Sequence, residues 1–199
     1  MSKSMPVLKK FYQEEVIPEL KKKFSLENIH DVPKLVKVVI NTGVGAKNEK
    51  QYLEDVQRDM ALITGQKPVV TKARVSVSNF KIREGMPVGV RVTLRGASMW
   101  EFLYRLINIS LPNIRDFRGV PGKLDGNGNY NLGITDHTIF PEISVDSKHI
   151  SMGMDVTIVT TGDTDEKGRE LLRLLGMPFR KPQGGPTQDQ GEQQGSQAA

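Results

Sequence analysis

The chain has 199 residues, of which 37% are hydrophobic and 26% are charged, a composition typical of a folded domain rather than of a disordered chain. It contains no cysteine, which excludes disulfides and thiolate metal sites, and no apolar run long enough to cross a membrane. The net charge of +5 favours a polyanionic partner. We therefore expect a cytoplasmic protein with no membrane partner and no metal or other cofactor.

The first part of the chain predicts a helix, a strand and a second helix. Apolar residues recur at helical spacing over 8–24, and Pro18 lies inside this helix, where it should kink or divide it. A strand follows at 35–45, and the second helix runs over about 48–64 to a stop at Gly65. In the strand, Val36, Val38 and Ile40 alternate with Lys37, Val39 and Asn41.

The segment 66–95 concentrates the positive charge of the chain. It contains seven basic residues and a single acid, Glu84. Residues 68–83 predict a strand that enters and leaves a basic, flexible loop, and 88–95 predicts the clearest strand of the sequence. In that strand Val88, Val90, Val92 and Leu94 face one way, and Gly89, Arg91, Thr93 and Arg95 face the other. A cationic loop of this kind suits a phosphate-rich groove.

The last part of the chain predicts two helices and a strand. Ser98 and Glu101 form a capping box for the first of these helices, and the stretch 113–150 that follows it is rich in loop residues. The elements are a helix over 99–111, a strand over 154–159, and a helix over 165–175 that Thr164 or Asp163 caps and Gly176 ends. The Gln/Gly-rich tail 182–199 is expected to be disordered, beyond a single folded domain over 1–181.

Few, two-faced strands interleaved with helices predict an α+β fold, in which helices cover one face of a sheet. Cations mixed with uncharged hydrogen-bonding groups suit phosphates, sugar hydroxyls and base edges. The open face is therefore predicted to bind nucleic acid. It should carry Lys37, Val39 and Asn41 from one strand, and Arg91, Thr93 and Arg95 from another.

Signals for catalysis or metal binding are weaker than this charge pattern. The turn NTGVGAKN lies between a strand and a helix, as a phosphate-binding loop does, but Ala46 and Asn48 stand where a glycine and a hydroxyl residue are required. A glycine turn with Asn48 as the helix cap explains it better, and a nucleotide-dependent enzyme stays open as an alternative. The histidines His30, His137 and His149 do not have metal-ligand spacing and are expected to be exposed or in loops.

Several segments together resemble the L5 family of bacterial ribosomal proteins, whose members bind 5S rRNA in the large subunit. They include VVINTGVG (38–45), ITGQKPVVTKAR (63–74), NFKIREGMPVGVRVTLRG (79–96), MWEFLYRLI (99–107), RDFRGV (115–120), GNYNLGI (128–134), FPEI (140–143), DVTIVTT (155–161) and MPFRK (177–181). The resemblance covers about 5–181. The chain departs from the family pattern in its Gln/Gly tail and at Pro18.

The resemblance implies a five-stranded antiparallel sheet with helices packed on one face, and contacts to 5S rRNA through the sheet region. The family's polar contact positions correspond here to Asn41, Gln66 and Thr93. On charge grounds, the basic neighbours Lys37, Lys67, Arg91 and Arg95 are added to this site. The resemblance also implies that the loop at about 72–80 reaches the peptidyl-site tRNA, through Lys72, Arg74, Ser76 and Ser78.

The resemblance implies further partners on the ribosome. They are 23S rRNA, other proteins of the central protuberance, and a small-subunit head protein across an intersubunit bridge, for which 112–149 is the expected side. The expected function is therefore structural, in anchoring 5S rRNA within the large subunit, and not enzymatic. A non-specific RNA-binding chaperone is the second alternative, because charge alone would bind unrelated RNAs equally well.

Overall fold

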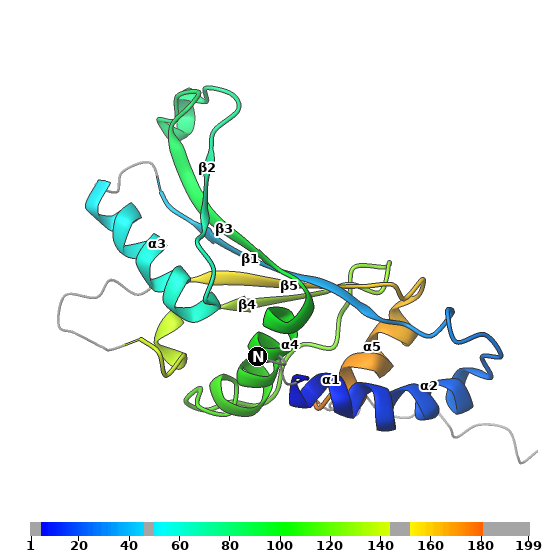
Figure 1. The fold of residues 1–199 in the computed structure, drawn as a ribbon. Coiled ribbons are helices and arrows are strands. Elements are labelled where there is room, and N and C mark those ends of the chain that lie inside the picture. The colour runs from blue at the N-terminus through cyan, green and yellow to red at the C-terminus, as the bar shows by residue number, and fades with distance from the viewer. Residues whose placement is uncertain (1–4, 46–49, 144–151, 181–199) are drawn as a thin grey trace, which may run out of the picture.

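The computed structural model describes residues 5–45, 50–143 and 152–180, which form an antiparallel sheet with helices packed against it (Figure 1). The five strands lie in the order β2-β3-β1-β5-β4, which confirms the α+β class and the five-stranded sheet. They are β1 (Leu35–Gly43), β2 (Val69–Lys72), β3 (Pro87–Leu94), β4 (Tyr130–Ile134) and β5 (Met154–Thr160). The expected helix cap Asn48, His149 and the tail 182–199 lie outside the described residues.

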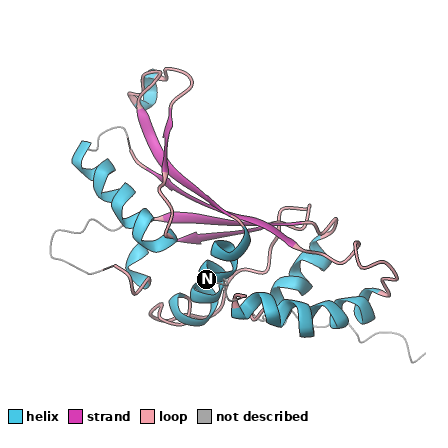
Figure 2. Cartoon of the chain, in the orientation of Figure 1, coloured by secondary structure: helices cyan, strands magenta, loops and turns pink. Residues whose placement is uncertain are grey.

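The helices gather on one side of the sheet, and the β2–β3 hairpin projects away from them (Figure 2). The α-helices are α1 (Val7–Phe11), α2 (Ile17–Phe24), α3 (Lys50–Thr64), α4 (Gly96–Arg105) and α5 (Asp165–Leu174). Shorter turns accompany them: the π turns η1 (Tyr12–Val16) and η3 (Leu106–Ser110) and the 3-10 turn η4 (His137–Ile139) belong to this layer, and the 3-10 turn η2 (Ser78–Phe80) lies at the tip of the hairpin. Within this layer the rings of Tyr12 and Trp100 lie 5.4 Å apart, joining the first helix to α4.

The central strands alternate between core and open face, as their sequence pattern predicts. Val38 and Ile40 of β1 are buried together with their partners Leu94 and Val92 on β3. Helix α3 packs on this face, since its buried Met60 takes a hydrogen bond at sulfur from the Thr42 hydroxyl of β1, at 3.9 Å. The intervening side chains point to the other face, which no described helix covers.

The beginning of β1 differs from the prediction. Leu35 is buried and Val36 is exposed, whereas the alternation had placed Val36 with Val38. The pairing of β1 with β5 shifts its register between Leu35 and Lys37, and such a shift moves side chains to the opposite face of a sheet.

Helix boundaries confirm some expectations and correct others. Gly65 and Gly176 end their helices with φ of 67° and 93°, and the Thr164 hydroxyl accepts from the backbone N–H of Lys167 at the start of α5. The capping box at Ser98 is wrong, because α4 already begins at Gly96 and Ser98 lies inside it. The first helix continues past Pro18, which lies in the first turn of α2. The π turn η1 comes directly before α2, and its wider hydrogen-bond spacing accommodates a proline that has no backbone N–H to donate.

The described part of the loop-rich stretch, 113–143, contains more regular structure than its composition suggests. It contains β4, whose Tyr130, Leu132 and Ile134 are buried in alternation, and the 3-10 turn η4. His137 was expected to be exposed or in a loop, and it lies in the short turn η4 but is not exposed. Its side chain is fully buried, its Nδ1 accepts from the backbone N–H of Met152 at 3.2 Å, and its Nε2 lies 3.6 Å from Asp59 Oδ2 of α3. His137 therefore ties η4 to α3 inside the core.

Candidate nucleic-acid interface

The register of the sheet brings the predicted polar residues into two neighbouring rows on the open face. In the first row, Asn41 of β1 pairs with Arg91 of β3 on one side and with Asp155 of β5 on the other. In the second row, Val39 lies between Thr93 and Thr157. We call this surface the open face. Its members are Lys37, Val39, Asn41, Arg91, Thr93, Asn131, Asp155 and Thr157.

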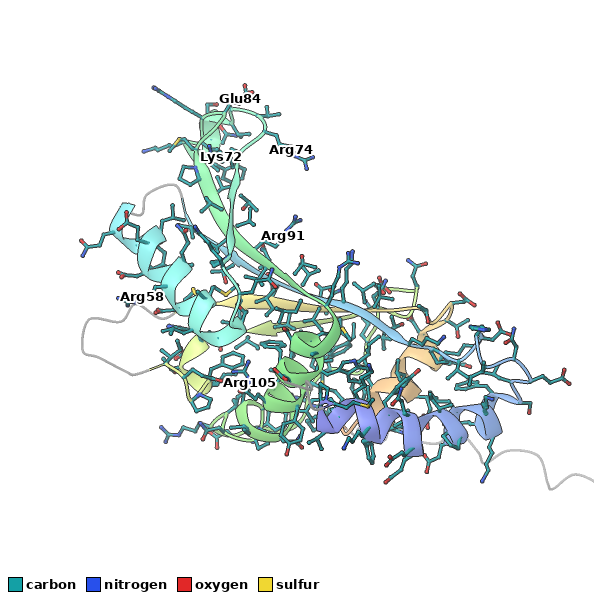
Figure 3. All side chains as sticks on the ribbon, in the orientation of Figure 1. Arg58, Lys72, Arg74, Glu84, Arg91 and Arg105 are labelled. Carbon is teal, nitrogen blue, oxygen red and sulfur yellow. The ribbon has the colours of Figure 1, made fainter. Side chains whose placement is uncertain are left out.

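The cations of this region are available for a ligand. Arg91 and Arg95 are exposed and Lys37 is half-buried, and none of them forms an ion pair with a described carboxylate. Arg91 extends from the base of the hairpin on the side away from the helices (Figure 3). Asn41 and Thr93 are half-buried, so their polar groups are accessible while their positions are held by the strands.

Gln66 and Lys67 lie at the edge of the sheet rather than within it. Both are exposed in the connection from α3 to β2. Strand β2 begins its pairing with Val69 opposite Arg91, so this connection approaches β3 near Arg91 and Thr93. Of the predicted 5S rRNA residues, the four on the strands therefore lie on the open face, Gln66 and Lys67 lie in the connection to the edge strand β2, and Arg95 follows the end of β3.

Three polar residues of the open face were missed in the sequence-based site. Thr157 donates a hydrogen bond from its hydroxyl to Asn131 Oδ1 at 2.7 Å, which joins β5 to β4. Asp155 is exposed beside them and contributes the carboxylate of the open face. The alternation over 154–159 already places Asp155 and Thr157 outward, whereas Asn131 could not be placed without recognising β4.

The basic loop is a structured extension of the β2–β3 hairpin. Backbone hydrogen bonds continue past the strands, from Ala73 N–H to the Met86 carbonyl at 2.8 Å and between Val77 and Ile82 in both directions. Lys72 and Arg74 point outward along it, well above the helices (Figure 3). The expected flexible loop is therefore a projecting hairpin, because these ladder bonds hold its two sides together.

The hairpin tip combines polar, cationic and apolar side chains. Ser76 and Ser78 are exposed, and the Ser76 hydroxyl accepts from the backbone N–H of Glu84 at 2.9 Å, so it also shapes the tip. Val75 and Phe80 are 68% and 71% exposed. An exposed aromatic ring among cations is a platform on which a nucleic-acid base can stack. Phe80 was not predicted as a site residue from the sequence, although it lies within the basic segment 66–95.

Comparison with known proteins identifies the family. The sequence model described as Ribosomal protein L5 matches residues 28–83, and that of the C-terminus of the same ribosomal family matches 87–179. The chain is 55% identical to Large ribosomal subunit protein uL5 of Halothermothrix orenii over 179 residues, which cover 89% of the chain and 100% of the relative. This chain belongs to the ribosomal protein L5 family.

Other relatives agree in extent. The uL5 proteins of Thermus thermophilus and of a Synechocystis species are 56% and 57% identical, each over 87% of this chain and 97% of the relative. Strands β1 and β2 belong to the first matched segment and β3 to β5 to the second, so the open face of this L5-family protein draws on both. None of the described helices is long and apolar enough to span a membrane.

Proposed function

We propose that this chain is a structural protein of the large ribosomal subunit that binds 5S rRNA through the open face and helps to anchor it in the central protuberance. The observation that supports the proposal is the pair of registered rows, in which the exposed Arg91 lies beside the half-buried Asn41 and next to Thr93, on a side of the sheet that no described helix covers. Family membership supports the ribosomal role, and it sets aside the nucleotide-dependent enzyme.

The open face can bind RNA in two complementary ways. Lys37 and Arg91 of the open face, together with Arg95 directly after β3, would neutralise phosphates, which supplies affinity that falls with salt. Asn41 and Thr93 offer hydrogen-bonding groups to sugar hydroxyls and base edges, which set the register of the RNA on the sheet. Since β1 has neighbours on both sides, these groups are preorganised before the RNA arrives.

The hairpin is proposed to reach a different RNA, the peptidyl-site tRNA. It projects from the sheet, so its tip can extend past RNA bound on the open face (Figure 2). Lys72 and Arg74 would contact phosphates, Ser76 and Ser78 would add hydrogen bonds, and Phe80 would stack against an unpaired base. Contacts to 23S rRNA, to other central-protuberance proteins and to a small-subunit head protein complete the proposal, with the bridge contact on the side formed by 112–149.

A competition assay tests the proposal. Labelled 5S rRNA is titrated with the protein at near-physiological salt, against excess tRNA and unrelated hairpin RNA. Asn41→Ala and Thr93→Ala should each weaken 5S binding by ~1–3 kcal/mol for a lost hydrogen bond at the interface, which is about five- to 150-fold in affinity. Arg74→Ala should leave 5S binding unchanged, since it lies on the hairpin, and should impair tRNA positioning on assembled ribosomes.

Lys22→Gln is the matched control, because Lys22 is exposed on α2 in the helical layer. Unchanged 5S affinity in both Asn41→Ala and Thr93→Ala would contradict the assignment of the open face. Equal competition by every RNA would favour the non-specific RNA-binding chaperone. Loss of 5S affinity in Arg74→Ala would show that the hairpin contacts 5S rRNA rather than tRNA.

A further inference from the structure

The Gly/Asn run DGNGNYNLG, over 125–133, contains the two dipeptides of this chain that cyclise most readily. When glycine follows asparagine or aspartate, its nitrogen can approach the side-chain carbonyl carbon with little hindrance, because glycine has no Cβ and a freely rotating backbone. The chain contains one Asn-Gly step, Asn127–Gly128, and one Asp-Gly step, Asp125–Gly126. Both steps therefore lie in the single turn that precedes β4.

The packing of the turn requires glycine at position 128, so the reactive Asn-Gly step cannot be avoided by another residue there. Gly128 is buried with a φ of 74°, and a Cβ on it would overlap the carbonyl oxygen of Gly162. Asn127, in contrast, is exposed, so water and solvent bases reach its side-chain amide. An accessible amide is thus joined to a glycine that the fold needs.

A single carboxylate oxygen holds both glycine nitrogens of the turn. Asp165 is half-buried at the start of α5, and its Oδ1 accepts from the backbone N–H of Gly126 at 2.9 Å and from that of Gly128 at 3.0 Å. These are the nitrogens that would attack the neighbouring side chains. A hydrogen bond to an anion favours the protonated nitrogen, and the negative charge opposes the amide anion that cyclisation needs.

The Asp-Gly step has a protection of its own. Hydrogen bonds lower the pKa of the Asp125 carboxyl, first that from the Asn129 side chain and then that from the backbone N–H of Asn127. The carboxyl therefore stays ionised at neutral pH, and a carboxylate is a poor electrophile. Asn127 carries a neutral amide and lacks this protection, so its stability depends on the Gly128 nitrogen.

We propose that Asn127 is a deamidation site that the fold keeps closed, and that Asp165 is the residue that closes it. This inference goes beyond the proposed function and does not depend on RNA binding. Ring closure turns the Gly128 nitrogen towards the Asn127 side chain, so its bond to Asp165 must break first. The site therefore opens when the start of α5 leaves the turn, and deamidation marks molecules in which this helix is not docked.

The reaction needs only water and a solvent base. The base removes the proton of the Gly128 nitrogen, whose electron pair then forms a bond to Cγ of Asn127. The Cγ–Nδ2 bond breaks, and Nδ2 takes a proton from solvent and leaves as ammonia. A water molecule then opens the succinimide ring at either carbonyl, which gives aspartate or isoaspartate at position 127. Overall a water molecule is consumed and an ammonia molecule is released, with no change of oxidation state.

Either product would disturb the docking of α5. A carboxylate at position 127 adds a negative charge to a turn that already contains Asp125 and binds Asp165. Isoaspartate also lengthens the backbone by one carbon atom, directly before a residue whose carbonyl accepts from the Thr160 hydroxyl of β5 at 2.8 Å. The modification would therefore keep the site open once it has formed.

The test follows deamidation of Asn127 in the full chain by peptide mapping and mass spectrometry during incubation at mildly alkaline pH. A synthetic peptide of residues 122–132 gives the rate for an unstructured chain. Wild type should deamidate at least about tenfold more slowly than the peptide, and Asp165→Ala should recover most of that difference. Glu166→Ala is the matched control, because it removes the same charge from an exposed position in the same turn of α5, and it should behave as wild type.

Hydrogen exchange of the Gly128 amide separates local opening from unfolding. This amide should be protected in wild type and lose its protection in Asp165→Ala, while the amides of β1 stay protected in both proteins. A Gly128 amide that exchanges in wild type as fast as in the peptide would overturn the inference without any variant.

Three other results would also overturn it. The first is wild type that deamidates at the rate of the peptide, and the second is Asp165→Ala that deamidates no faster than wild type. The third is acceleration that Glu166→Ala shares, or that comes with lost protection in β1, because stability of the whole fold would then control the rate.

Discussion

Replacing Gly168 by alanine is expected to destabilise the protein, although alanine is the better helix former. Gly168 lies within α5, where alanine ordinarily adds about 1 kcal/mol of stability. Here a Cβ would lie 2.4 Å from the carbonyl oxygen of Gly128 and 2.9 Å from Leu124 Cδ2. Both distances are shorter than real contacts, so either α5 or the turn that precedes β4 has to move.

The turn is not free to withdraw, because three hydrogen bonds hold it. The Thr160 hydroxyl donates to the Gly128 carbonyl at 2.8 Å, and the N–H groups of Gly126 and Gly128 donate to Asp165 Oδ1 at 2.9 and 3.0 Å. Overpacking costs about 1–3 kcal/mol, and each hydrogen bond lost costs about 1 kcal/mol more. If one of these hydrogen bonds is lost, the net loss after subtraction of the helix-propensity gain is about 1–3 kcal/mol, or roughly 2–12 °C in Tm for a chain of this size.

Thermal and urea unfolding followed by circular dichroism measure this loss. Gly122→Ala is the matched control, since nothing lies within 4 Å of a Cβ at that position and its φ is not left-handed. The control should unfold with wild type. If Gly168→Ala unfolds at or above the wild-type Tm, the close packing of α5 on the turn before β4 does not limit stability and the steric reasoning is refuted.

Two further predictions concern charges. Asp155→Asn should tighten 5S rRNA binding about two- to threefold, because a carboxylate on the open face repels phosphates at ~7 Å by about 0.6 kcal/mol in water; weaker binding would show that Asp155 accepts an RNA hydroxyl. Burial raises the pKa of the Glu170 carboxyl, but hydrogen bonds from Arg173 and Lys23 lower it by more, so the pKa lies below the ordinary 4.5. Its stabilising effect is therefore present above pH 4.5 and lost as the pH falls through the lowered native value. Glu170→Gln should lose about 1–3 kcal/mol in urea unfolding at neutral pH, and a difference that persists undiminished in acid would contradict this.

The open face could be predicted from the sequence because a strand's two faces follow from local alternation. Alternation with a period of two residues is enough to place Arg91 and Thr93 on the face opposite their buried neighbours, whichever strands pair with β3. The order and register in which the strands pair could not be predicted from the sequence in the same way. That Asn41 lies between Arg91 and Asp155 depends on the sheet order, which brings together strands more than a hundred residues apart.

Features that depend on distant packing were missed for the same reason. Strand β4 is five residues long and follows a Gly/Asn run whose composition indicates turns, and its burial comes from β5 and the segment near Phe179. His137 is polar in sequence, yet contacts from Met152 and Asp59 satisfy it in the core. Val36 is exposed through a register shift that no local pattern reveals.

The distribution of ion pairs explains how a modest net charge can still leave unpaired cations on the open face and the hairpin. In the helical layer, carboxylates are placed to neutralise cations, as Glu170 does for Lys23 and Arg173, so that layer contributes little to the field. The cations of the hairpin and the open face have no ion pair with a described carboxylate. A surface on which cations have no acid partner exchanges its counterions for phosphates without first breaking ion pairs. The same +5 spread evenly over the molecule would bind RNA weakly and without orientation, whereas unpaired cations gathered on the open face and the hairpin support the proposal that these two surfaces bind RNA.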